Sequence, residues 1–533
     1  GGRSPRGKAR GEQAPARVDR PPPRMAVRRA TMARRLRLRA SSSARLLGLA
    51  CAVAAACGAC SRWGPSLAFA APPPASPHPS PLPWGGDAAA GALGLAQHPK
   101  STRRPASPFG GRPRPGATVA FSGAADAAKA GTTSVTASSL NLAKNLVGSG
   151  ILSLPAGVAA FSASPAALWP ALVFLAVATV LSAYGFFLIG RVCEETQSST
   201  FGAAWKGSLK RGSWVPQLVC ILECFGGSVV YAMVIGDVLS SLIGGFLPVG
   251  LPMRTLSILG IGVTTLFPLC CLRSFGQLSR FSLLGTIATS YVVLFVAKRF
   301  FDGSYGPGGA FFDASTHPVL QASGAVGLNA NMLVLLSILS TAYLVHFNAP
   351  QMYAELEPGD AKATKQKKFA LVGLYGFGIA AVQYALIMVF GFLTFGRATQ
   401  GNVLLNYANG DLLGIGARAA IGISMLFGYP MQFAGLRSGI LEAAGSEIDL
   451  PKGKHRLVTA AILGGILGVA CLFHDLGKFQ AIEGALLAAF LIYIAPPMMA
   501  LRLWGGPWAK ARFYTFIGIG IVLTVVGCKV TMA

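Results

Sequence analysis

Gly148, Ser149 and Gly150 interrupt an apolar segment that is long enough to cross a membrane. Pro155 follows five residues after the last of them. Inside hydrocarbon every backbone N–H and C=O needs a partner, so an interrupted helix persists only where protein or a polar cavity surrounds it. Freed N–H groups bind carboxylates, and freed C=O groups bind ammonium groups or cations. The expected chemistry is recognition of a small charged molecule by peptide groups, including those of Ile151.

Ionisable side chains also lie in apolar segments, where a charge must face a cavity or a partner. Lys144 can place an ammonium group in a cation site or extend to the membrane interface. His346 can relay protons, since imidazole titrates near neutral pH, or it can cap its helix. Asp237 is expected to pair near the outer interface, whereas Glu223 lies deeper in the same segment. Lys144, Glu223 and His346 are therefore the candidates for coupling to an ion.

The sixth apolar segment, 331–350, carries several hydroxyl groups. Ser340, Thr341 and Tyr343 can contact a bound molecule, or they can form hydrogen bonds with backbone carbonyls and neighbouring helices. No glycine marks a break in this segment. If segments one to five are repeated upside down by segments six to ten, the sixth is the counterpart of the interrupted first segment. An interruption is expected here on symmetry and polarity alone.

Long apolar helices must position these residues. The chain has 533 residues, 53% hydrophobic and only 12% charged, which indicates a multi-pass membrane protein. The fold class expected is all-α integral membrane, with eleven transmembrane helices. The eleven apolar runs are 137–161, 167–190, 215–243, 255–272, 282–300, 331–350, 369–395, 412–436, 457–473, 480–501 and 512–530. The loops on one side carry 17 Lys and Arg against seven on the other, which places the amino end of the first run on the cytosol-like side.

Residues 1–130 are predicted to form a largely disordered basic leader rich in Pro, Ala and Ser, and 131–533 the transmembrane domain. The leader holds 21 Lys and Arg and four Asp and Glu, so the high net charge does not predict nucleic-acid binding. An Arg-rich stretch, a short apolar run and an acid-poor region follow in the order of a signal peptide and a transit-like segment. With Phe69 after a possible cleavage site, the leader resembles the two-part plastid presequence of some algae. The resemblance implies the plastid envelope; a plain secretory signal would place the chain in endomembranes or the plasma membrane.

An enzyme is not expected, because no catalytic constellation is visible. Among the histidines only His346 and His474 approach a span, and no pair has metal-ligand spacing. The cysteines lie mostly in apolar runs, where they act as small packing residues. The sequence therefore predicts no metal and no cofactor.

Five motifs occur in order along the membrane segments. They are 141–155, 267–273, 346–356, 391–396 with 402–406, and Tyr429-Pro430 ahead of Arg437. With these motifs the chain resembles the amino acid/auxin permease family over about residues 130–530. The resemblance implies the LeuT-like, 5+5 inverted-repeat fold of the amino acid/polyamine/organocation superfamily, with discontinuous helices 1 and 6. It also implies an amino acid as substrate and an ion as coupling partner.

Two departures from the family bear on the coupling ion. Sodium-coupled members have Asn at the position of Lys144 and a hydroxyl residue at the position of Gly428. Both differences remove an oxygen ligand from the sodium site that the resemblance implies, and a hard cation needs several such ligands. The sequence therefore favours proton coupling or facilitated diffusion over sodium.

The function expected is secondary active transport of amino acids across a lipid bilayer by alternating access. Two alternatives stay open, namely an amino-acid sensor on a transporter fold and a transporter of another small amine or organic acid.

Overall fold

The computed structural model describes Gly1 and residues 131–243, 252–272, 282–313, 329–359, 364–504 and 506–532, with backbone only for 282–284. The predicted leader lies outside the described residues except for Gly1. One compact unit, Pro65–Ala443 with Ile448–Ala533, contains all the helices discussed below. A second unit comprises Gly1–Gly64 and Ala444–Glu447, and its described part after Gly1 is a turn with Gly445 at a φ of +65°.

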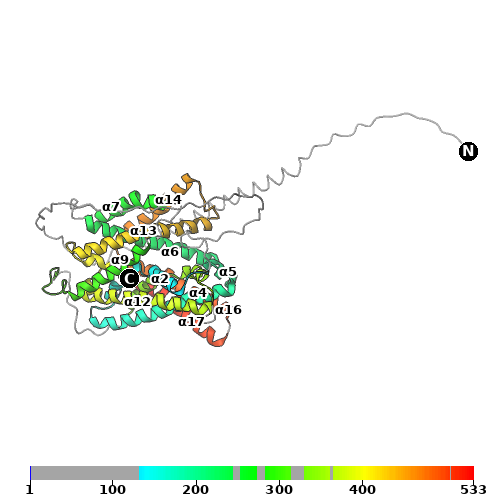
Figure 1. The fold of residues 1–533 in the computed structure, drawn as a ribbon, viewed down its shortest axis with the longest axis horizontal. Coiled ribbons are helices and arrows are strands. Elements are labelled where there is room, and N and C mark those ends of the chain that lie inside the picture. Colours follow the sequence, from blue (N-terminus) through cyan, green and yellow to red (C-terminus); the bar gives the residue numbers. More distant parts are fainter. Residues whose placement is uncertain are drawn as a thin grey trace, which may run out of the picture. The chain divides into compact units, whose positions relative to one another are not determined.

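Helices make up nearly all of the described chain, and within it no β-strand occurs beyond one isolated bridge between Thr133 and Leu356. The helices that matter here are α2 (Val135–Leu146), α3 (Leu154–Ala159), α4 (Leu168–Thr196), α6 (Trp214–Ile243), α7 (Met253–Ile261), α9 (Ser282–Phe301), α10 (Met332–Ala342), α11 (Ala349–Glu355), α12 (Lys365–Phe395), α13 (Leu412–Ala443), α14 (Lys452–Leu472), α15 (Leu476–Glu483), α16 (Ala495–Leu503) and α17 (Pro507–Val522). The long helices run broadly alongside one another (Figure 1).

The prediction of an all-helical membrane protein is confirmed. In the described ranges nine helices are long and apolar enough to cross a membrane, and a bent pair formed by Val135–Leu146 and Ser149–Ala159 makes up to ten. Helix α9 occupies the fifth predicted run but is not among these ten.

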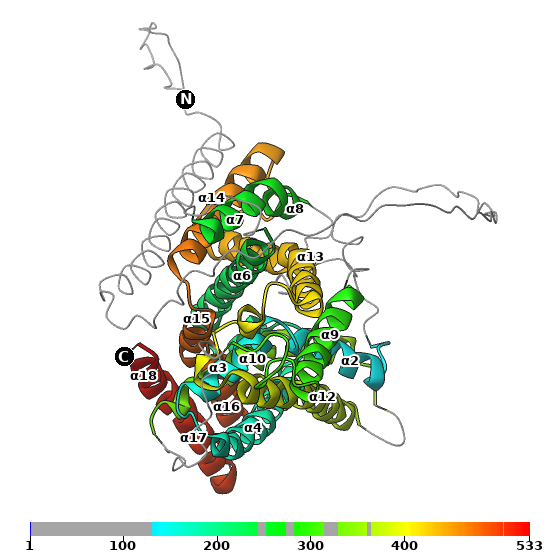
Figure 2. The same cartoon turned by 90° about the vertical axis from the view of Figure 1, so that its left-hand side faces the viewer.

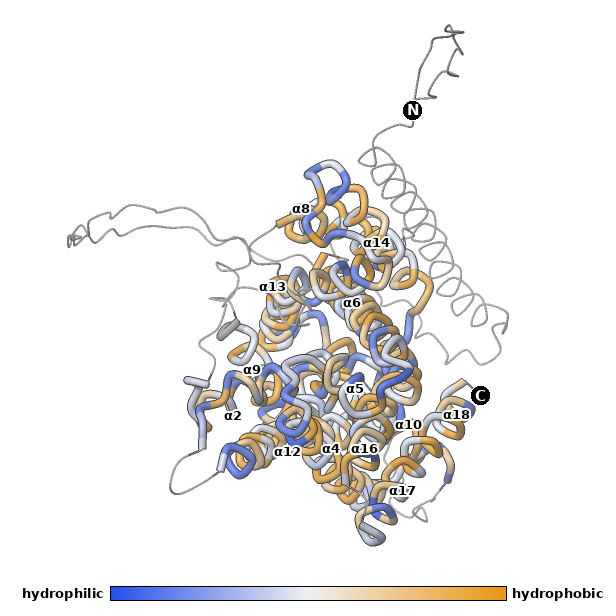
Figure 3. The backbone as a smooth tube through the Cα atoms, turned by 90° about the vertical axis from the view of Figure 1, so that its right-hand side faces the viewer, coloured by the Kyte–Doolittle hydropathy of each residue, from blue (hydrophilic) through white to orange (hydrophobic). Residues whose placement is uncertain are grey.

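The helices separate an apolar outer face from a packed inner face. On α4, Trp169, Val173 and Val180 recur at helical spacing and are exposed, Trp169 to 75%. Ala171 and Ala178 lie on the other side of α4 and are buried. Figure 3 shows that apolar residues colour most of α4, α16 and α17. Since a soluble helix would present polar residues on its outer face, these helices fit a lipid environment.

The interrupted segments lie inside the bundle. Helix α10 packs against α3 and α15, and α2 packs against α12. Figure 2 shows α3 and α10 near the middle, with α6 on one side and α4 and α12 on the other. The pair α6 and α13 packs closely along another part of the bundle. The two segments expected to carry the site are therefore enclosed by protein, as their free peptide groups require.

The first segment is interrupted where the sequence predicts it. Helix α2 ends at Leu146, Gly148 has φ −118° and ψ −142°, and a 3₁₀ turn over Ser149–Ser153 follows. Helix α3 then begins at Leu154 with Pro155 in its first turn, where a missing N–H costs no hydrogen bond. The two parts are bent by 48°. The predicted break in the first helix is confirmed.

The sixth segment is interrupted as well. Helix α10 ends at Ala342, residues 343–345 are not helical, and a 3₁₀ turn over His346–Asn348 leads into α11. Pro350 lies in the first turn of α11. The break expected from symmetry is therefore present, although no glycine marks it.

Candidate functional site

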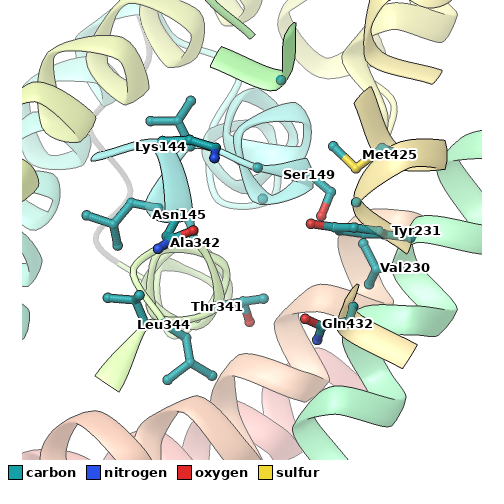
Figure 4. Close-up of a pocket in the computed structure, with 18 of the residues that line it drawn as sticks. Lys144, Asn145, Ser149, Val230, Tyr231, Thr341, Ala342, Leu344, Met425 and Gln432 are labelled. Carbon is teal, nitrogen blue, oxygen red and sulfur yellow. The ribbon is translucent and has the colours of Figure 1, made fainter. Parts of the chain in front are cut away.

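Both interruptions face one cavity of about 430 Å³. The side chains and peptide groups that line it come from α2 and the break after it, from α6, α9, α13 and α15, and from the break after α10. The residues that line it include Asn141, Lys144, Asn145, Gly148, Ser149, Gly150, Glu223, Tyr231, Thr341, Ala342, Asn348, Gly428, Gln432, Gln480 and Glu483. Figure 4 shows Lys144 and Asn145 on one side of this cavity and Tyr231 and Gln432 on the other.

The two glycines of the first break differ in their surroundings. A Cβ added at Gly148 would meet no heavy atom within 4 Å among the described residues, so this position is open. A Cβ added at Gly150 would lie 2.9 Å from Cα of Ala342. Gly150 therefore lets the first break approach the end of α10, while Gly148 leaves room in the cavity. Ser149 lies between them and also lines the cavity.

Tyr384 of α12 connects the two breaks. Its hydroxyl oxygen lies 2.7 Å from the carbonyl oxygen of Leu146 and 2.6 Å from that of Ala342. These carbonyls are at the last residues of α2 and α10, so each has lost its partner in the helix. A phenol has one proton, so Tyr384 can donate to one carbonyl at a time. The side chain is fully buried, and its hydroxyl group contacts the ends of both helices.

Carboxyl groups approach the cavity from two helices. Glu223 lies on α6 and Glu483 at the end of α15, and both line the cavity although each is at least nine-tenths buried. The two carboxyl groups interact electrostatically. Gln480, one turn before Glu483, lines the same wall and is fully buried. Thr341 donates a hydrogen bond of 2.8 Å to the backbone carbonyl of Gln480, which joins this wall to the second break.

Lys144 contributes a positive charge to the cavity. It lies in the last turn of α2 and is half-buried. Among the residues that the structure describes, no carboxylate oxygen lies within 4.0 Å of its amine. The ammonium group is thus available to an anionic group in the cavity.

Of the predicted contact residues, the structure brings Gly148, Ser149, Gly150 and Thr341 to the cavity, together with the ion-coupling candidates Lys144 and Glu223. The other four, Ile151, Ser340, Tyr343 and His346, are buried in helix packing beside it and do not line it.

The three polar members of this second group have partners elsewhere. Ser340 donates to the carbonyl of Leu336 at 2.8 Å, and the hydroxyls of Tyr343 and Thr179 are 2.7 Å apart. The His346 Nε2 atom lies 2.9 Å from the carbonyl oxygen of Ser182. These contacts occupy the two hydroxyl groups and Nε2 of His346, whereas Nδ1 of His346 has no hydrogen-bond partner in the described part of the chain.

Asp237 has the structural partner expected for it. Its Oδ1 accepts a hydrogen bond of 2.6 Å from Nε of Arg254, and Nη1 of Arg254 donates to the carbonyl of Ala470. The pair ties α6 to α7 and α14.

Sequence reasoning missed Gln480, Glu483, Tyr231 and Gln432. Glu483 lies within the tenth apolar run, so the rule that selected Glu223 also applies to it. The other three are uncharged residues whose position depends on helix packing, and no local pattern distinguishes them.

The cavity extends from the breaks toward the end of the bundle at which α2 begins. Asn141 and Lys144 line it before the first break, and Asn348 lines it after the second. On the opposite side of the breaks, Ser153 donates a hydrogen bond of 2.6 Å to the carbonyl of Gly401. A Cβ at Gly391 of α12 would lie 2.7 Å from Cγ of Pro155, so packing there is tight.

A multi-pass helical protein with a cavity at two interrupted helices has the architecture of secondary transporters. The sequence matches the family described as "Transmembrane amino acid transporter protein" over residues 131–533, and the chain belongs to this family. The family resemblance drawn from the motifs is thereby confirmed. The family consists of transporters and not of enzymes.

The individual relatives have low sequence identity to this chain, but the alignments are long. The chain is 24% identical over 394 residues to "Putative sodium-coupled neutral amino acid transporter 11" of Danio rerio, covering 73% of this chain and 83% of that protein. It is 26% identical over 369 residues to "Vacuolar amino acid transporter 5" of Schizosaccharomyces pombe, covering 67% and 81%. Among solved structures, the inward-facing conformation of Mhp1 aligns with a TM-score of 0.48 at 12% identity, covering 76% of this chain and 89% of that chain.

Proposed function

We propose that this chain is a secondary active transporter that moves amino acids by alternating access, coupled to protons and independent of sodium. One observation carries the proposal, namely that the two interrupted helices meet at a single cavity inside the membrane bundle. The proposed framework is eleven transmembrane helices in a 5+5 inverted repeat, with α9 as the fifth span. With the amino end on the cytosol-like side, the cavity opens toward the cytosol.

The proposed substrate contacts are the peptide groups of Gly148, Ser149 and Gly150 and the hydroxyl of Thr341. Peptide N–H groups at the first break suit the carboxylate of an amino acid, and Lys144 adds a positive charge. The Thr341 hydroxyl already donates to Gln480, so its oxygen is left to accept from the ammonium group. Ile151, Ser340 and Tyr343 do not line the cavity, and their proposed role is to hold the two breaks in place through packing.

Glu223 is the proposed proton carrier. It is buried, lines the cavity and has no cation within 4.0 Å among the described residues. His346 is proposed to position α4 through Ser182, because its Nε2 is already engaged there.

Sodium independence rests on the chemistry of two lining positions. Lys144 and Gly428 line the cavity, and neither provides a side-chain oxygen. A sodium ion needs several oxygen ligands, and an ammonium group nearby opposes its binding. One relative has "sodium-coupled" in its name and another has "vacuolar".

The proposed location is the plastid envelope, on the strength of the leader alone. An endomembrane or the plasma membrane is the alternative. The two are separated by fusing the leader to a reporter protein, whose import into isolated plastids would support the plastid envelope.

The coupling is tested with purified protein in liposomes. We expect a pH gradient, acid outside, to drive accumulation of labelled amino acids without sodium, as in a proton symporter. Accumulation that needs a sodium gradient and ignores pH would contradict the coupling. Binding of an amino acid without any movement, even by exchange, would favour a sensor instead.

A further inference from the structure

One wall of the cavity is built from Glu223, Gln480 and Glu483, here called the acidic wall. Their exposed fractions are 7%, 0% and 5%. Two helices that are far apart in sequence, α6 and α15, contribute to it. A Cβ at Gly226 of α6 would overlap Oε1 of Glu483, so α6 has a glycine where that carboxyl group packs against it.

The acidic wall contains polar atoms with no hydrogen-bond partner in the described part of the chain. They are Oε2 of Glu223, Oε1 of Glu483, and both Nε2 and Oε1 of Gln480. Burial of such atoms without a partner is costly, and burial of a charge is costlier. Because Gln480 is fully buried and its amide lies in the cavity wall, the wall presents a donor and several acceptors to a ligand.

Among the described residues, no cationic side chain lies within 4.0 Å of a carboxylate oxygen of the acidic wall; Lys144 lines the same cavity but forms no ion pair with it. The ionisable groups that interact with the two carboxyls are each other and the thiols of Cys220 and Cys224. Within the described ranges, none of the ion pairs includes Glu223 or Glu483.

The charges that line the cavity sum to minus one when Lys144, Glu223 and Glu483 are all ionised. A zwitterionic amino acid adds no net charge, so it leaves one negative charge for a proton to neutralise. An amino acid with a cationic side chain adds one positive charge and balances the cavity by itself. Oxygen acceptors on two carboxylates and an amide match the several donors of an ammonium or guanidinium group.

We propose that the acidic wall is a subsite for the cationic side chain of a basic amino acid, which takes the place of the coupling proton. The proposal rests on the proposed function, and it adds a substrate class to it. The α-carboxylate of the substrate then lies at the first break and Lys144, and the side chain reaches toward α6 and α15.

The test compares L-lysine with L-norleucine, which has the same carbon chain without the side-chain ammonium group. Dissociation constants are measured for both probes with the purified full chain in detergent or lipid. We expect the wild type to bind L-lysine at least about tenfold more tightly than L-norleucine. In E483Q and E223Q this ratio is expected to fall about tenfold, because a charged acceptor is lost. E195Q, which changes an exposed carboxyl group on α4, is the control and keeps the wild-type ratio.

The outcomes separate the two proposals. If L-norleucine binds and L-lysine has no advantage, or if E483Q and E223Q keep the wild-type ratio, the subsite is refuted and the transporter assignment stands. If neither amino acid binds the wild type, nor any other amino acid in a panel, both proposals fail.

Proton counting gives a second readout that a purely structural role of Glu483 would not change. With a pH-sensitive dye inside liposomes, each L-lysine that enters is expected to carry one proton fewer than each L-norleucine. Equal proton numbers for the two amino acids would overturn the proposed replacement.

Discussion

At the scale of single residues, two glycines of the first break have separate roles. The sequence offered Gly148 and Gly150 together as backbone contacts, yet only Gly148 has open space beside it. Gly150 is required by the close approach of Ala342. The position that tests the cavity without disturbing helix packing is therefore Gly148.

Gly148→Val is expected to lower amino-acid uptake more than tenfold, because the added side chain enters the cavity. Its φ of −118° is negative, so the substitution does not place a valine side chain on a left-handed backbone. Uptake and melting temperature are measured together. Gly378→Val on α12 is the matched control, since a Cβ there also meets no atom within 4 Å in the described chain and the residue does not line the cavity. Equal uptake by the two variants would contradict the placement of the site.

Glu223→Gln is expected to abolish accumulation driven by a pH gradient while leaving exchange of amino acids across the membrane. The amide keeps the size of the side chain but cannot take up the proton. Asp237→Asn, fourteen residues along the same helix, is the contrasting variant. It leaves Arg254 without its carboxylate, so it is expected to lower the melting temperature and to keep proton-driven uptake. The reverse pattern would show that Glu223 is structural.

Much of the site could be predicted from the sequence, and there is a physical reason why the rest could not. Glycines in an apolar run, and acids in another, are local signals that identified the first break and Glu223. Glu483 carries the same signal, because it is an acid within the apolar run 480–501. Gln480, Tyr231 and Gln432 carry no such signal, because an uncharged side chain becomes part of a cavity only through helix packing.

At the scale of elements, the first break was predictable and the second was predictable only by symmetry. Glycine residues and Pro155 weaken the first helix locally. Residues 343–345 contain neither glycine nor proline, and the contact beside them is the hydrogen bond from Tyr384, 42 residues further along the chain, to the carbonyl oxygen of Ala342. A tertiary hydrogen bond of this kind has no signature in the segment that it contacts.

Tyr384→Phe is expected to reduce uptake about fivefold, because it removes the hydroxyl that contacts both helix ends and one such bond contributes about 1 kcal/mol. The phenyl ring keeps the packing, so the protein remains folded. Tyr375→Phe, an exposed tyrosine on the same helix, is the control and is expected to transport normally. Unchanged uptake by Tyr384→Phe would mean that the breaks do not depend on this contact.

At the scale of the whole molecule, a charge cluster joins the end of α9 to the start of α13. Asp411, which directly precedes α13, is fully buried and accepts hydrogen bonds from Nε and Nη2 of Arg299 at 2.9 and 2.5 Å and from Tyr305 at 3.0 Å. Burial acts to raise the pKa of Asp411, but the hydrogen bonds from Arg299 and Tyr305 outweigh it, so its pKa is lowered. The ionised form therefore stabilises the fold.

This cluster predicts acid sensitivity. Because the pKa of Asp411 is lower in the folded chain, its contribution is fully present above the ordinary aspartate pKa of about 4 and is lost as the pH falls below it. We expect Asp411→Asn to lower the melting temperature at pH 7 and the difference from wild type to shrink below about pH 4. A difference that is constant with pH would indicate that the carboxylate charge is not involved.

The assignment of the chain to its family depends on features that are shared by relatives of low sequence identity. Apolar runs of membrane length and motifs in a fixed order predicted a helical membrane protein of this family, and the match over residues 131–533 confirms the family. The cavity, its direction and its charge balance could not be predicted, since they arise from helices as distant in sequence as α6 and α15.

The central claim is that the protein carries an amino acid across the membrane while the amino acid is bound in the cavity at the two breaks. Counterflow tests it most directly, because labelled amino acid entering liposomes preloaded with the unlabelled form needs no ion gradient. We predict rapid counterflow for the wild type and for Gly378→Val, and counterflow more than tenfold slower for Gly148→Val. Counterflow by Gly148→Val at the wild-type rate would contradict the claim, and so would its absence from a wild-type protein that binds the amino acid.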